Sequence, residues 1–260
     1  MSMQTDQARD DTAEASGNSG YQWDHFDPEA YFQHYYGNPH PDDDCLTRLA
    51  ARALKCAPHA GNDLDLIDIG TGPNLIPFLC ALPRARSMMA WDFSASNAAW
   101  LEAELQRDTL RAPWQHFWDE SRAAYGPMWQ LSECPVSALR AKCTITCGSI
   151  FDLPERCWDG ATMFFCAESI TQRMDEFEEA MSAFAKCVKP GGALIGAFLV
   201  QSDGYDVGGR RYPALRLSAD TIEAVFALNA SSVKAQRIGI VEQEIRSGYS
   251  GCVFLTGVAR

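Results

Sequence analysis

Blocks of hydrophobic and polar positions alternate along this chain and predict strands and helices in turn. Short apolar runs typical of buried strands fall at residues 64–70, 87–93, 142–150, 160–169 and 193–200. Apolar residues at helical spacing predict helices at residues 42–56, 74–82, 94–108, 174–189 and 218–229. Pro190, Gly191 and Gly192 are expected to end the fourth of these helices.

The alternation of helices with nearly continuous apolar strands predicts an α/β fold, with a parallel Rossmann-like sheet and helices on both of its faces. The last two predicted strands, at 235–245 and 251–259, have no helix between them. We therefore expect an antiparallel hairpin at one edge of the sheet.

The first 20 residues differ in composition from the rest of the chain. They contain no aromatic and no branched aliphatic residue, so they bury too little apolar surface to offset the entropy cost of ordering. We expect a disordered tail at 1–20 and a single domain at 21–260. Residues 108–142 are long for a connection, and their tryptophan, tyrosine and phenylalanine residues predict a folded insert.

An aromatic cluster follows the tail, in the stretch DPEAYFQHYYGNP at residues 27–39. Tyr31 and Tyr35 are four residues apart, as are Phe32 and Tyr36, so each pair shares a face if the segment is helical. Aromatic rings in such a position either pin a helix to the core or cover a ligand. The pattern alone leaves both roles open.

A turn with two glycines follows the first buried strand and is the candidate ligand-binding motif. In LDLIDIGTGPN, residues 64–74, Gly70 allows the sharp turn and Gly72 lets the backbone approach a ligand closely. Asp92 ends the next strand about 20 residues later, where an acid typically accepts hydrogen bonds from ribose hydroxyls. This turn of the sheet is therefore predicted to hold a nucleoside.

The turn lacks two features that a dinucleotide site requires. Leu75 stands where a third glycine would allow close packing of helix on strand, and no Arg or Lys lies close by for a pyrophosphate. A nucleoside without phosphates fits better. This favours S-adenosylmethionine over a nicotinamide cofactor.

Composition and charge narrow the classes of partner. Hydrophobic residues make up 47% and charged residues 22% of the chain, which is ordinary for a globular protein. A net charge of −12 disfavours binding to nucleic acid or to an anionic membrane, because both depend on basic residues. We expect a small-molecule partner.

The ten cysteines include no Cys-x-x-Cys pair and no Cys/His cluster with zinc spacing, so no metal site is predicted. The N-terminus lacks a signal-peptide pattern, and no apolar run approaches the ~18 residues of a membrane span. A reduced, cytoplasmic setting is expected. Five cysteines lie in apolar runs and are expected in the core: Cys80, Cys143, Cys147, Cys166 and Cys252.

From about Phe26 to the C-terminus, the chain resembles the small-molecule N-methyltransferases that act on nicotinamide, phenylethanolamine and thioethers or indolethylamine. The stretches that carry the resemblance are FDPEAYFQHYY, LIDIGTGPN, WDFSASN, FFCAES and KPGGALIGAF. The resemblance implies a seven-stranded class I methyltransferase sheet, a tyrosine-bearing lid at 21–60 and a monomer. The implied cofactor is S-adenosylmethionine, which would leave as S-adenosylhomocysteine.

The resemblance also implies which residues hold the cofactor. Aromatic faces attract its sulfonium, and a closed lid excludes water from the transfer step. Where the family has an aspartate for the adenine amine, this chain has Gly148-Ser149-Ile150, so Ser149, Asp152 or the backbone takes that role. The implied cofactor-binding residues are Tyr31, Tyr36, Gly70, Thr71, Gly72, Asn74, Asp92, Phe93, Asn97, Ser149 and Ile150.

On the acceptor side, the chain keeps one pocket carboxylate of the family, Glu168 of FFCAES. The family's other amine-binding acids align with Gly196 and with Gln201 or Ser202. We expect catalytic roles for Glu168, which would orient an ammonium substrate and accept its proton, and for Tyr31 of the lid. The expected substrate-binding residues are Phe165, Glu168, Phe198, Gln201 and Tyr205.

The main prediction is therefore N-methylation of a small amine, and the missing acids leave a second reaction open. A nearly uncharged aromatic pocket would fold the methionine chain so that its own amine attacks the γ-carbon. That reaction releases methylthioadenosine and a small cyclic amino acid, such as azetidine carboxylate. A non-catalytic protein that binds S-adenosylmethionine is a third possibility.

Overall fold

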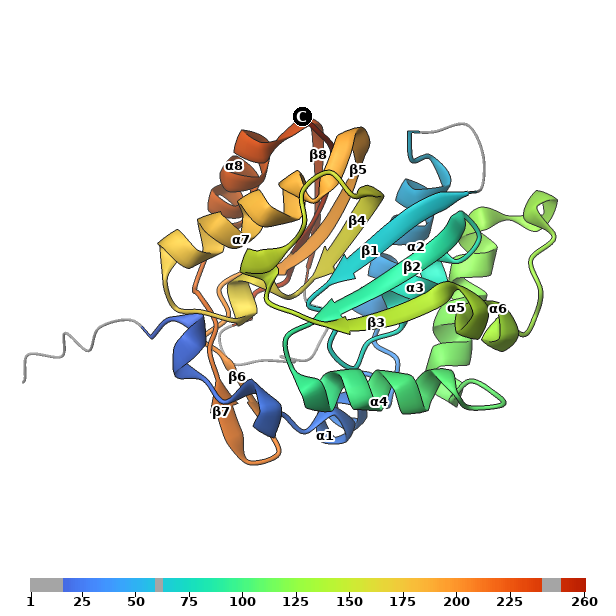
Figure 1. The fold of residues 1–260 in the computed structure, drawn as a ribbon, viewed down its shortest axis with the longest axis horizontal. Coiled ribbons are helices and arrows are strands. Elements are labelled where there is room, and N and C mark those ends of the chain that lie inside the picture. Colours follow the sequence, from blue (N-terminus) through green and yellow to red (C-terminus); the bar gives the residue numbers. More distant parts are fainter. Residues whose placement is uncertain (1–15, 59–62, 240–248) are drawn as a thin grey trace, which may run out of the picture.

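The computed structural model describes residues 16–58, 63–239 and 249–260. Residues 1–15 of the expected tail at 1–20, and residues 240–245 of the strand predicted at 235–245, lie outside the described residues. The main sheet has seven strands in the order β3-β2-β1-β4-β5-β9-β8 (Figure 1). β9 runs antiparallel to β5 and to β8, and the other pairs are parallel. The predicted α/β fold with an edge hairpin is confirmed. The strands are β1 Leu64–Ile69, β2 Ala85–Asp92, β3 Cys143–Cys147, β4 Trp158–Phe164, β5 Val188–Leu199, β8 Ala230–Ile238 and β9 Cys252–Ala259.

Helices cover both faces of this sheet, and a small two-stranded ribbon, β6 Tyr205–Val207 with β7 Arg210–Tyr212, stands beside it. In Figure 1, α7 and α8 lie on one side of the sheet, while α2, α3 and α5 lie on the other. The α-helices of the described chain are α1 Pro28–Tyr35, α2 Pro41–Lys55, α3 Ile76–Ala81, α4 Ala95–Leu105, α5 Ala112–Tyr125, α6 Val136–Lys142, α7 Met174–Lys186 and α8 Ala219–Asn229.

Each face of the sheet packs its own hydrophobic core, because alternate strand residues point to opposite sides. In β5, Ile195 and Leu199 join the core under α2, α3 and α5. Leu194 and Phe198 of the same strand join the core under α7 and α8. This alternation decides which side chains of β5 stand near a site on either face.

Serine side chains cap two of the helices, and the end of a third helix differs from the prediction. Ser94 caps α4 and Ser218 caps α8, each accepting a backbone N–H three residues ahead. The prediction that Pro190-Gly191-Gly192 ends α7 is wrong. That helix ends at Lys186, and the three residues lie inside β5, where the register with β4 shifts. A strand bulge accommodates the proline and glycines there.

The N-terminal segment, for which a lid at 21–60 was predicted, packs on the rest of the domain from Asn18 onward. Residues 16–20, which were expected in the tail, belong to the described chain. Asn18 begins a short 3₁₀ turn, and its backbone N–H donates to the Glu176 carboxylate at 2.7 Å. Glu29 of α1 accepts hydrogen bonds from Trp100 of α4 at 2.8 Å and from Arg111 at 2.7 Å. Phe32 is buried against Trp100 and Trp114.

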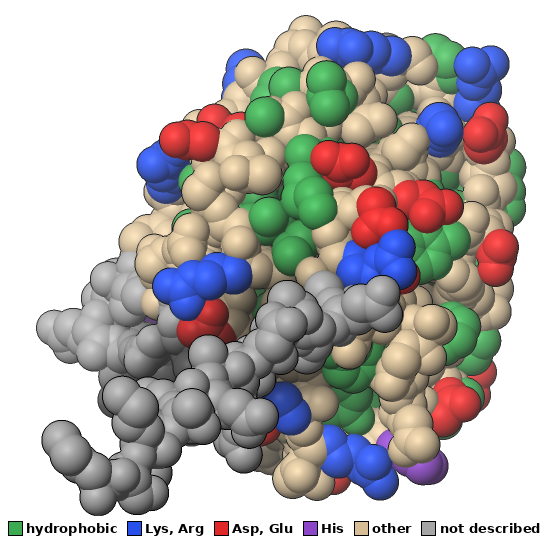
Figure 2. Space-filling view, turned by 90° about the vertical axis from the view of Figure 1, so that its left-hand side faces the viewer, with side chains coloured by type: hydrophobic (Ala, Val, Ile, Leu, Met, Phe, Trp, Pro, Cys, Tyr) green, Lys and Arg blue, Asp and Glu red, His purple; other side chains and the backbone are tan. Residues whose placement is uncertain are grey.

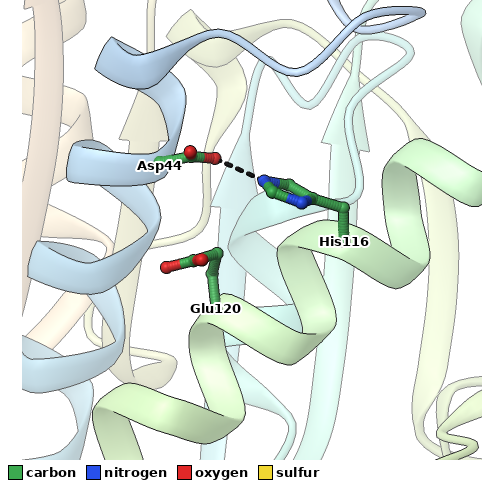
Figure 3. A group of neighbouring side chains, drawn as sticks. All are labelled: Asp44, His116 and Glu120. Atoms are coloured by element: carbon green, nitrogen blue, oxygen red, sulfur yellow. Dashed lines mark hydrogen bonds and ion pairs between the residues drawn. The ribbon is translucent and has the colours of Figure 1, made fainter.

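The segment at 108–142, predicted to be an insert, contains α5 and α6, and α5 packs along α2. Figure 3 shows His116 of α5 directed at Asp44 of α2, with the Nε2–Oδ1 distance at 2.6 Å. Glu120 lies one turn further along α5 and forms an ion pair with Arg48 of α2 at 2.6 Å. These polar contacts join α5 to α2.

Acidic and basic side chains are interspersed on the side of the molecule that Figure 2 shows, with hydrophobic side chains between them. Among the surface ion pairs, Arg237 pairs with Asp220 of α8. Within the described ranges, no helix combines the length and apolar character needed to cross a membrane. Of the cysteines expected in the core, Cys80, Cys166 and Cys252 are buried, Cys143 is half-buried and Cys147 is exposed.

Candidate active site

A cleft of about 800 Å³ opens at the carboxyl ends of the parallel strands. Its floor comes from the loop after β1 and from the ends of β2, β3 and β4, and its roof comes from the N-terminal segment. Ligands of open α/β sheets bind in this place, because the loops that follow neighbouring strands converge there.

The glycine loop forms one wall of the cleft, and its two glycines differ in their surroundings. Gly70 and Gly72 both adopt positive φ, at +64° and +55°. A Cβ atom on Gly70 would collide with the side chain of Cys166, whereas a Cβ on Gly72 would meet no protein atom closer than 4.0 Å. Gly70 is thus required by packing, and Gly72 borders open space that a ligand can fill.

Asp92 links this loop to the next helix. Its Oδ2 atom accepts the backbone N–H of Gly72 at 2.7 Å, and its Oδ1 atom accepts from the Ser94 N–H at 2.8 Å and the Asn97 side chain at 3.1 Å. Burial raises the pKa of this carboxyl above its ordinary value, and these hydrogen bonds oppose the rise. Asp92 lines the cleft, and a carboxylate with about four lone-pair sites can accept further hydrogen bonds, as binding of a ribose diol requires.

Asp68 lies behind the loop and outside the cleft lining. Its carboxyl is buried, accepts the Thr162 hydroxyl at 2.6 Å, and has its pKa raised to about 7 by that burial. The hydroxyl of Thr71 donates to the Asp68 carbonyl at 3.1 Å. Asp68 therefore braces the glycine loop from within the sheet.

The far end of the cleft suits a flat aromatic base. Phe93 lines the cleft with 54% of its surface exposed, which is unusual for a phenylalanine, and Ile150, which follows β3, lines the cleft too. Ser149 and the backbone of Gly148 also line this end, whereas Asp152 does not. Of the three predicted substitutes for the adenine-binding aspartate, Ser149 and the backbone are thus in position.

The roof of the cleft is aromatic. Trp23, Phe26, Tyr31 and Tyr36 come from the N-terminal segment, and Tyr205 comes from the β6–β7 ribbon. The ring centroids of Tyr31 and Phe26 are 5.4 Å apart, and those of Tyr31 and Tyr205 are 6.2 Å apart. Such π-faces attract a sulfonium cation and keep water from the transfer step.

Comparison with known proteins agrees with this geometry. The family model described as the NNMT/PNMT/TEMT family matches residues 17–255. The chain belongs to this family. A nicotinamide N-methyltransferase of Sus scrofa is 24% identical over 237 residues, which cover 86% of this chain and 88% of the relative. A phenylethanolamine N-methyltransferase of Bos taurus is 23% identical over 234 residues, covering 84% and 81%.

Solved structures show the same fold at lower identity. The N-methyltransferase NodS from Bradyrhizobium japonicum WM9, in complex with S-adenosylhomocysteine, has a TM-score of 0.52 at 11% identity and covers 85% of this chain and 89% of that one. A Burkholderia thailandensis 1,6-didemethyltoxoflavin N1-methyltransferase has a TM-score of 0.51 at 15% identity, covering 89% and 86%. The protein is a class I methyltransferase, and its cofactor is S-adenosylmethionine.

The methyltransferase brings together every residue that the sequence assigned to the cofactor. They all line the cleft: Tyr31, Tyr36, Gly70, Thr71, Gly72, Asn74, Asp92, Phe93, Asn97, Ser149 and Ile150. The open space at Gly72 and the exposed ring of Phe93 suit an adenosine. The buried Oδ1 atom of Asn97 has no hydrogen-bond partner among the described residues, so it too suits a polar ligand.

The predicted acceptor residues divide into two groups. Phe165 and Tyr205 line the cleft, whereas Glu168, Phe198 and Gln201 do not. Phe198 points into the core under α7 and α8, on the opposite face of the sheet. Gln201 instead accepts a hydrogen bond from Arg216 at 2.9 Å. Glu168 is fully buried, and its Oε1 atom accepts the backbone N–H of Leu199 at 2.9 Å.

Sequence analysis missed several residues of the roof and the floor. Asn18 was assigned to the tail, and Trp23 and Phe26 were not assigned to the cofactor, yet all three line the cleft. Tryptophan and phenylalanine directly before the tyrosine segment were the available signal. Cys166 was expected only as a core residue, and it also lines the cleft beside Gly70.

Proposed function

We propose that this protein N-methylates a small amine, using S-adenosylmethionine as the methyl donor. The observation that carries the proposal is a second cavity, which shares Tyr31, Tyr36 and Phe165 with the cleft. An acceptor in that cavity would meet the donor across these rings, away from bulk water. The names of the two relatives, both N-methyltransferases, also support the proposal.

Bound S-adenosylmethionine supplies an electrophilic methyl group on a sulfonium. The glycine loop and Asp92 hold its nucleoside, so that the rings of Tyr31 and Tyr36 face the sulfonium end. Those rings and Phe165 orient an acceptor whose nitrogen presents a neutral lone pair. Transfer forms the nitrogen–carbon bond as the carbon–sulfur bond breaks, with its electron pair staying on sulfur, and the new ammonium then loses its proton. Positioning accounts for most of the rate enhancement.

Glu168 does not touch the reacting groups in this scheme. Its carboxylate holds the backbone of Leu199, and Leu199 lines the second cavity. Glu168 therefore acts as a positioning residue for the wall of that cavity. This replaces the direct proton-accepting role expected from the sequence.

The proposal is tested by incubating the protein with S-adenosylmethionine that carries a deuterated methyl group and with a panel of small amines. Mass spectrometry would follow S-adenosylhomocysteine, methylthioadenosine and the labelled acceptor. We expect a labelled amine and an equal amount of S-adenosylhomocysteine, both abolished in Asp92→Ala. Methylthioadenosine formed faster than in a no-enzyme control, without any amine, would show the cyclising reaction instead. Tight cofactor binding without any turnover would indicate a non-catalytic protein.

We further propose that the protein works as a monomer in a reducing, cytoplasmic setting. All ten cysteines are free thiols in the structure, which suits such a compartment. We propose no nucleic-acid or membrane partner, in line with the net charge of −12. Light scattering after gel filtration would test the monomer, and a mass of twice 28.7 kDa would contradict it.

A further inference from the structure

Three potential metal ligands meet at the contact between α2 and α5. The Asp44 carboxylate, the His116 imidazole and the Glu120 carboxylate each offer one ligand atom, and these three atoms lie within 4.8 Å of one another. Figure 3 shows the three side chains directed towards one another across the two helices. None of the three lines the cleft or the second cavity, so the methyl-transfer scheme does not use them.

The group is assembled from two helices that are distant in sequence. His116 and Glu120 are four residues apart on α5 and therefore share one of its faces. Asp44 stands in the first turn of α2, 72 positions before His116, and its Oδ1 atom lies 2.6 Å from the His116 Nε2 atom. The search for zinc spacing along the sequence could not show this group, because that spacing describes ligands that are close in sequence.

The distances suit a single small cation after modest side-chain rotations. Ligand atoms lie about 2.0–2.2 Å from a tetrahedral zinc ion, and therefore roughly 3.3 Å from one another. The contact between Asp44 and His116 is shorter than this, at 2.6 Å, while the widest separation in the group reaches no more than 4.8 Å. All three side chains are half-buried, so each can rotate by this amount. The short contact holds a proton, and a bound cation takes the place of that proton.

The charges around the group also favour a cation. The Arg48 guanidinium contacts the Oε2 atom of Glu120 at 2.6 Å, which orients the carboxylate and leaves its Oε1 atom for a metal ion. Two carboxylates against one guanidinium leave one negative charge in excess beside a neutral imidazole. One imidazole with two carboxylates is a donor set that suits Zn²⁺, whereas Mg²⁺ and Ca²⁺ prefer oxygen ligands alone.

We propose that Asp44, His116 and Glu120 form a binding site for a divalent transition-metal ion, with Zn²⁺ as the ion that matches them best. Water completes the coordination of the ion, and the ion joins α5 to α2 in place of the direct contact between Asp44 and His116. The competing explanation is that the three side chains provide only a hydrogen bond and an ion pair between the helices. The site does not depend on the proposed N-methylation, and its test uses no methyl acceptor.

The test is a calorimetric titration of Zn²⁺ into the full-length protein after a chelator has removed bound metal. We expect one ion per chain at this site with a Kd below about 50 µM, and no measurable binding of Mg²⁺ in the same range. Zn²⁺ binding weaker than about 50 µM, or Mg²⁺ binding of equal strength, would overturn the proposal.

Variants on α5 locate the ion. His116→Gln keeps a hydrogen-bond donor for Asp44 but removes the imidazole, so we expect Zn²⁺ binding to weaken at least about tenfold, and Glu120→Gln should weaken it as well. Asp119→Asn is the matched control, because the Asp119 carboxylate accepts from Gln115 and Arg122 instead. Titration with S-adenosylhomocysteine shows that each variant is folded. An unchanged Kd in His116→Gln, or an equal loss in Asp119→Asn, would contradict the site.

Co²⁺ separates this site from the cysteines, which also bind such ions as thiolates. Four of the free thiols are exposed: Cys56, Cys134, Cys147 and Cys157. Co²⁺ held by nitrogen and oxygen shows only weak d–d absorption, whereas a thiolate ligand adds an intense charge-transfer band in the near ultraviolet. We expect the weak absorption alone, and we expect His116→Gln to remove it. A charge-transfer band that persists in His116→Gln would place the ion on cysteine and overturn the proposal.

Discussion

The Oδ2 atom of Asp92 accepts the backbone N–H of Gly72 at 2.7 Å, so the end of β2 is tied directly to the loop after β1. This contact joins the end of β2 to the loop after β1, and we expect the ribose and the methionine of the cofactor to bind along these two segments. The same carboxylate also holds the start of α4 through Ser94. One side chain thus organises the cofactor end of the cleft.

Replacing Asp92 by alanine should weaken cofactor binding strongly. The variant loses the acceptor for the ribose hydroxyls and leaves the Gly72 N–H without its partner. We expect the Kd for S-adenosylmethionine, measured by calorimetry, to rise by roughly 100-fold or more, since hydrogen bonds to charged groups contribute about 1.5–3 kcal/mol each. Asp65→Ala is the control, because Asp65 pairs with Arg86 away from the cleft. A Kd within threefold of the parent value (roughly 0.6 kcal/mol) in Asp92→Ala would contradict the assignment.

The two loop glycines should respond differently to the same change. Gly70→Ala introduces a methyl group that collides with Cys166, so we expect a large drop in Tm. Gly72→Ala meets open space, so its stability cost is limited to the left-handed backbone, about 1–2 kcal/mol. Its Kd for the cofactor should nevertheless rise, because the methyl group occupies ligand space. Equal loss of Tm in both variants, with cofactor affinity retained in Gly72→Ala, would argue against this account.

Stability should fall with rising pH through the titration of Asp68. Burial raises the pKa of this carboxyl to about 7 in the folded protein, while the unfolded value is about 3.9. Between these pH values the folded state binds more protons than the unfolded state. The stabilising contribution of the Asp68 carboxyl is therefore complete below about pH 4 and is lost as the pH passes 7. The loss amounts to about 4 kcal/mol at most. Urea unfolding across this range should show a smaller fall in Asp68→Asn, and an identical pH profile in the variant would exclude Asp68 as its cause.

The clamp between Arg111 and Glu29 should hold α1 over the cleft. Arg111 contacts Glu29 at 2.7 Å and Glu104 at 3.0 Å, and its guanidinium lies 4.5 Å from the centre of the Phe32 ring. Removing it in Arg111→Ala leaves the buried Glu104 with one partner fewer, so we expect the free energy of unfolding to fall by about 1–3 kcal/mol. Cofactor release, followed by stopped-flow fluorescence, should become faster as the roof loosens.

Arg86→Ala provides the comparison, since its pair with Asp65 is solvent-exposed and should contribute under about 1 kcal/mol. The clamp also has a pH signature. Arg111 lowers the pKa of Glu29 to about 2, so the contribution of the pair is complete above about pH 4.3 and is lost as the pH falls towards 2. Unchanged release kinetics in Arg111→Ala would show that the roof does not depend on the clamp.

Glu168 should behave as a positioning residue. Glu168→Ala leaves the buried N–H of Leu199 without its acceptor, and we expect an unfolding free energy lower by about 1–3 kcal/mol. Turnover per folded molecule should stay within about tenfold of the parent, with the change mainly in the KM for the acceptor. A loss of kcat of roughly 1,000-fold at an unchanged Tm would restore the direct catalytic role that the sequence suggested.

Much of the cofactor site follows from the sequence because it is local. Gly70, Gly72 and Asp92 stand at the ends of two neighbouring parallel strands, and this topology brings them together without any knowledge of side-chain packing. The acceptor side is different, since it depends on which face of β5 each residue takes. Phe198 lies four residues after Leu194 on the same strand, so both side chains point into the core under α7 and α8. Counting alternate residues along the strand would have predicted this.

Sequence patterns could not predict which of the acids at the start of α2 face inward. Asp42, Asp43 and Asp44 look alike as a helix start, and only the packing of α2 against α5 and β5 turns two of them inward and one outward. Asn18 was assigned to the disordered tail because a short polar stretch has no hydrophobic periodicity. Its place is set by Glu176 and by the Trp23 indole, which donates to its carbonyl at 3.1 Å.

The most direct test of the cofactor site is a crystal structure of the protein with S-adenosylhomocysteine. We expect both ribose hydroxyls within hydrogen-bond distance, about 2.5–3.0 Å, of the Asp92 carboxylate, and the adenine between Phe93 and Ile150. The methionine end should lie under Tyr31 and Tyr36. A ligand bound elsewhere, or a ribose that leaves Asp92 bonded only to Gly72, Ser94 and Asn97, would contradict the account.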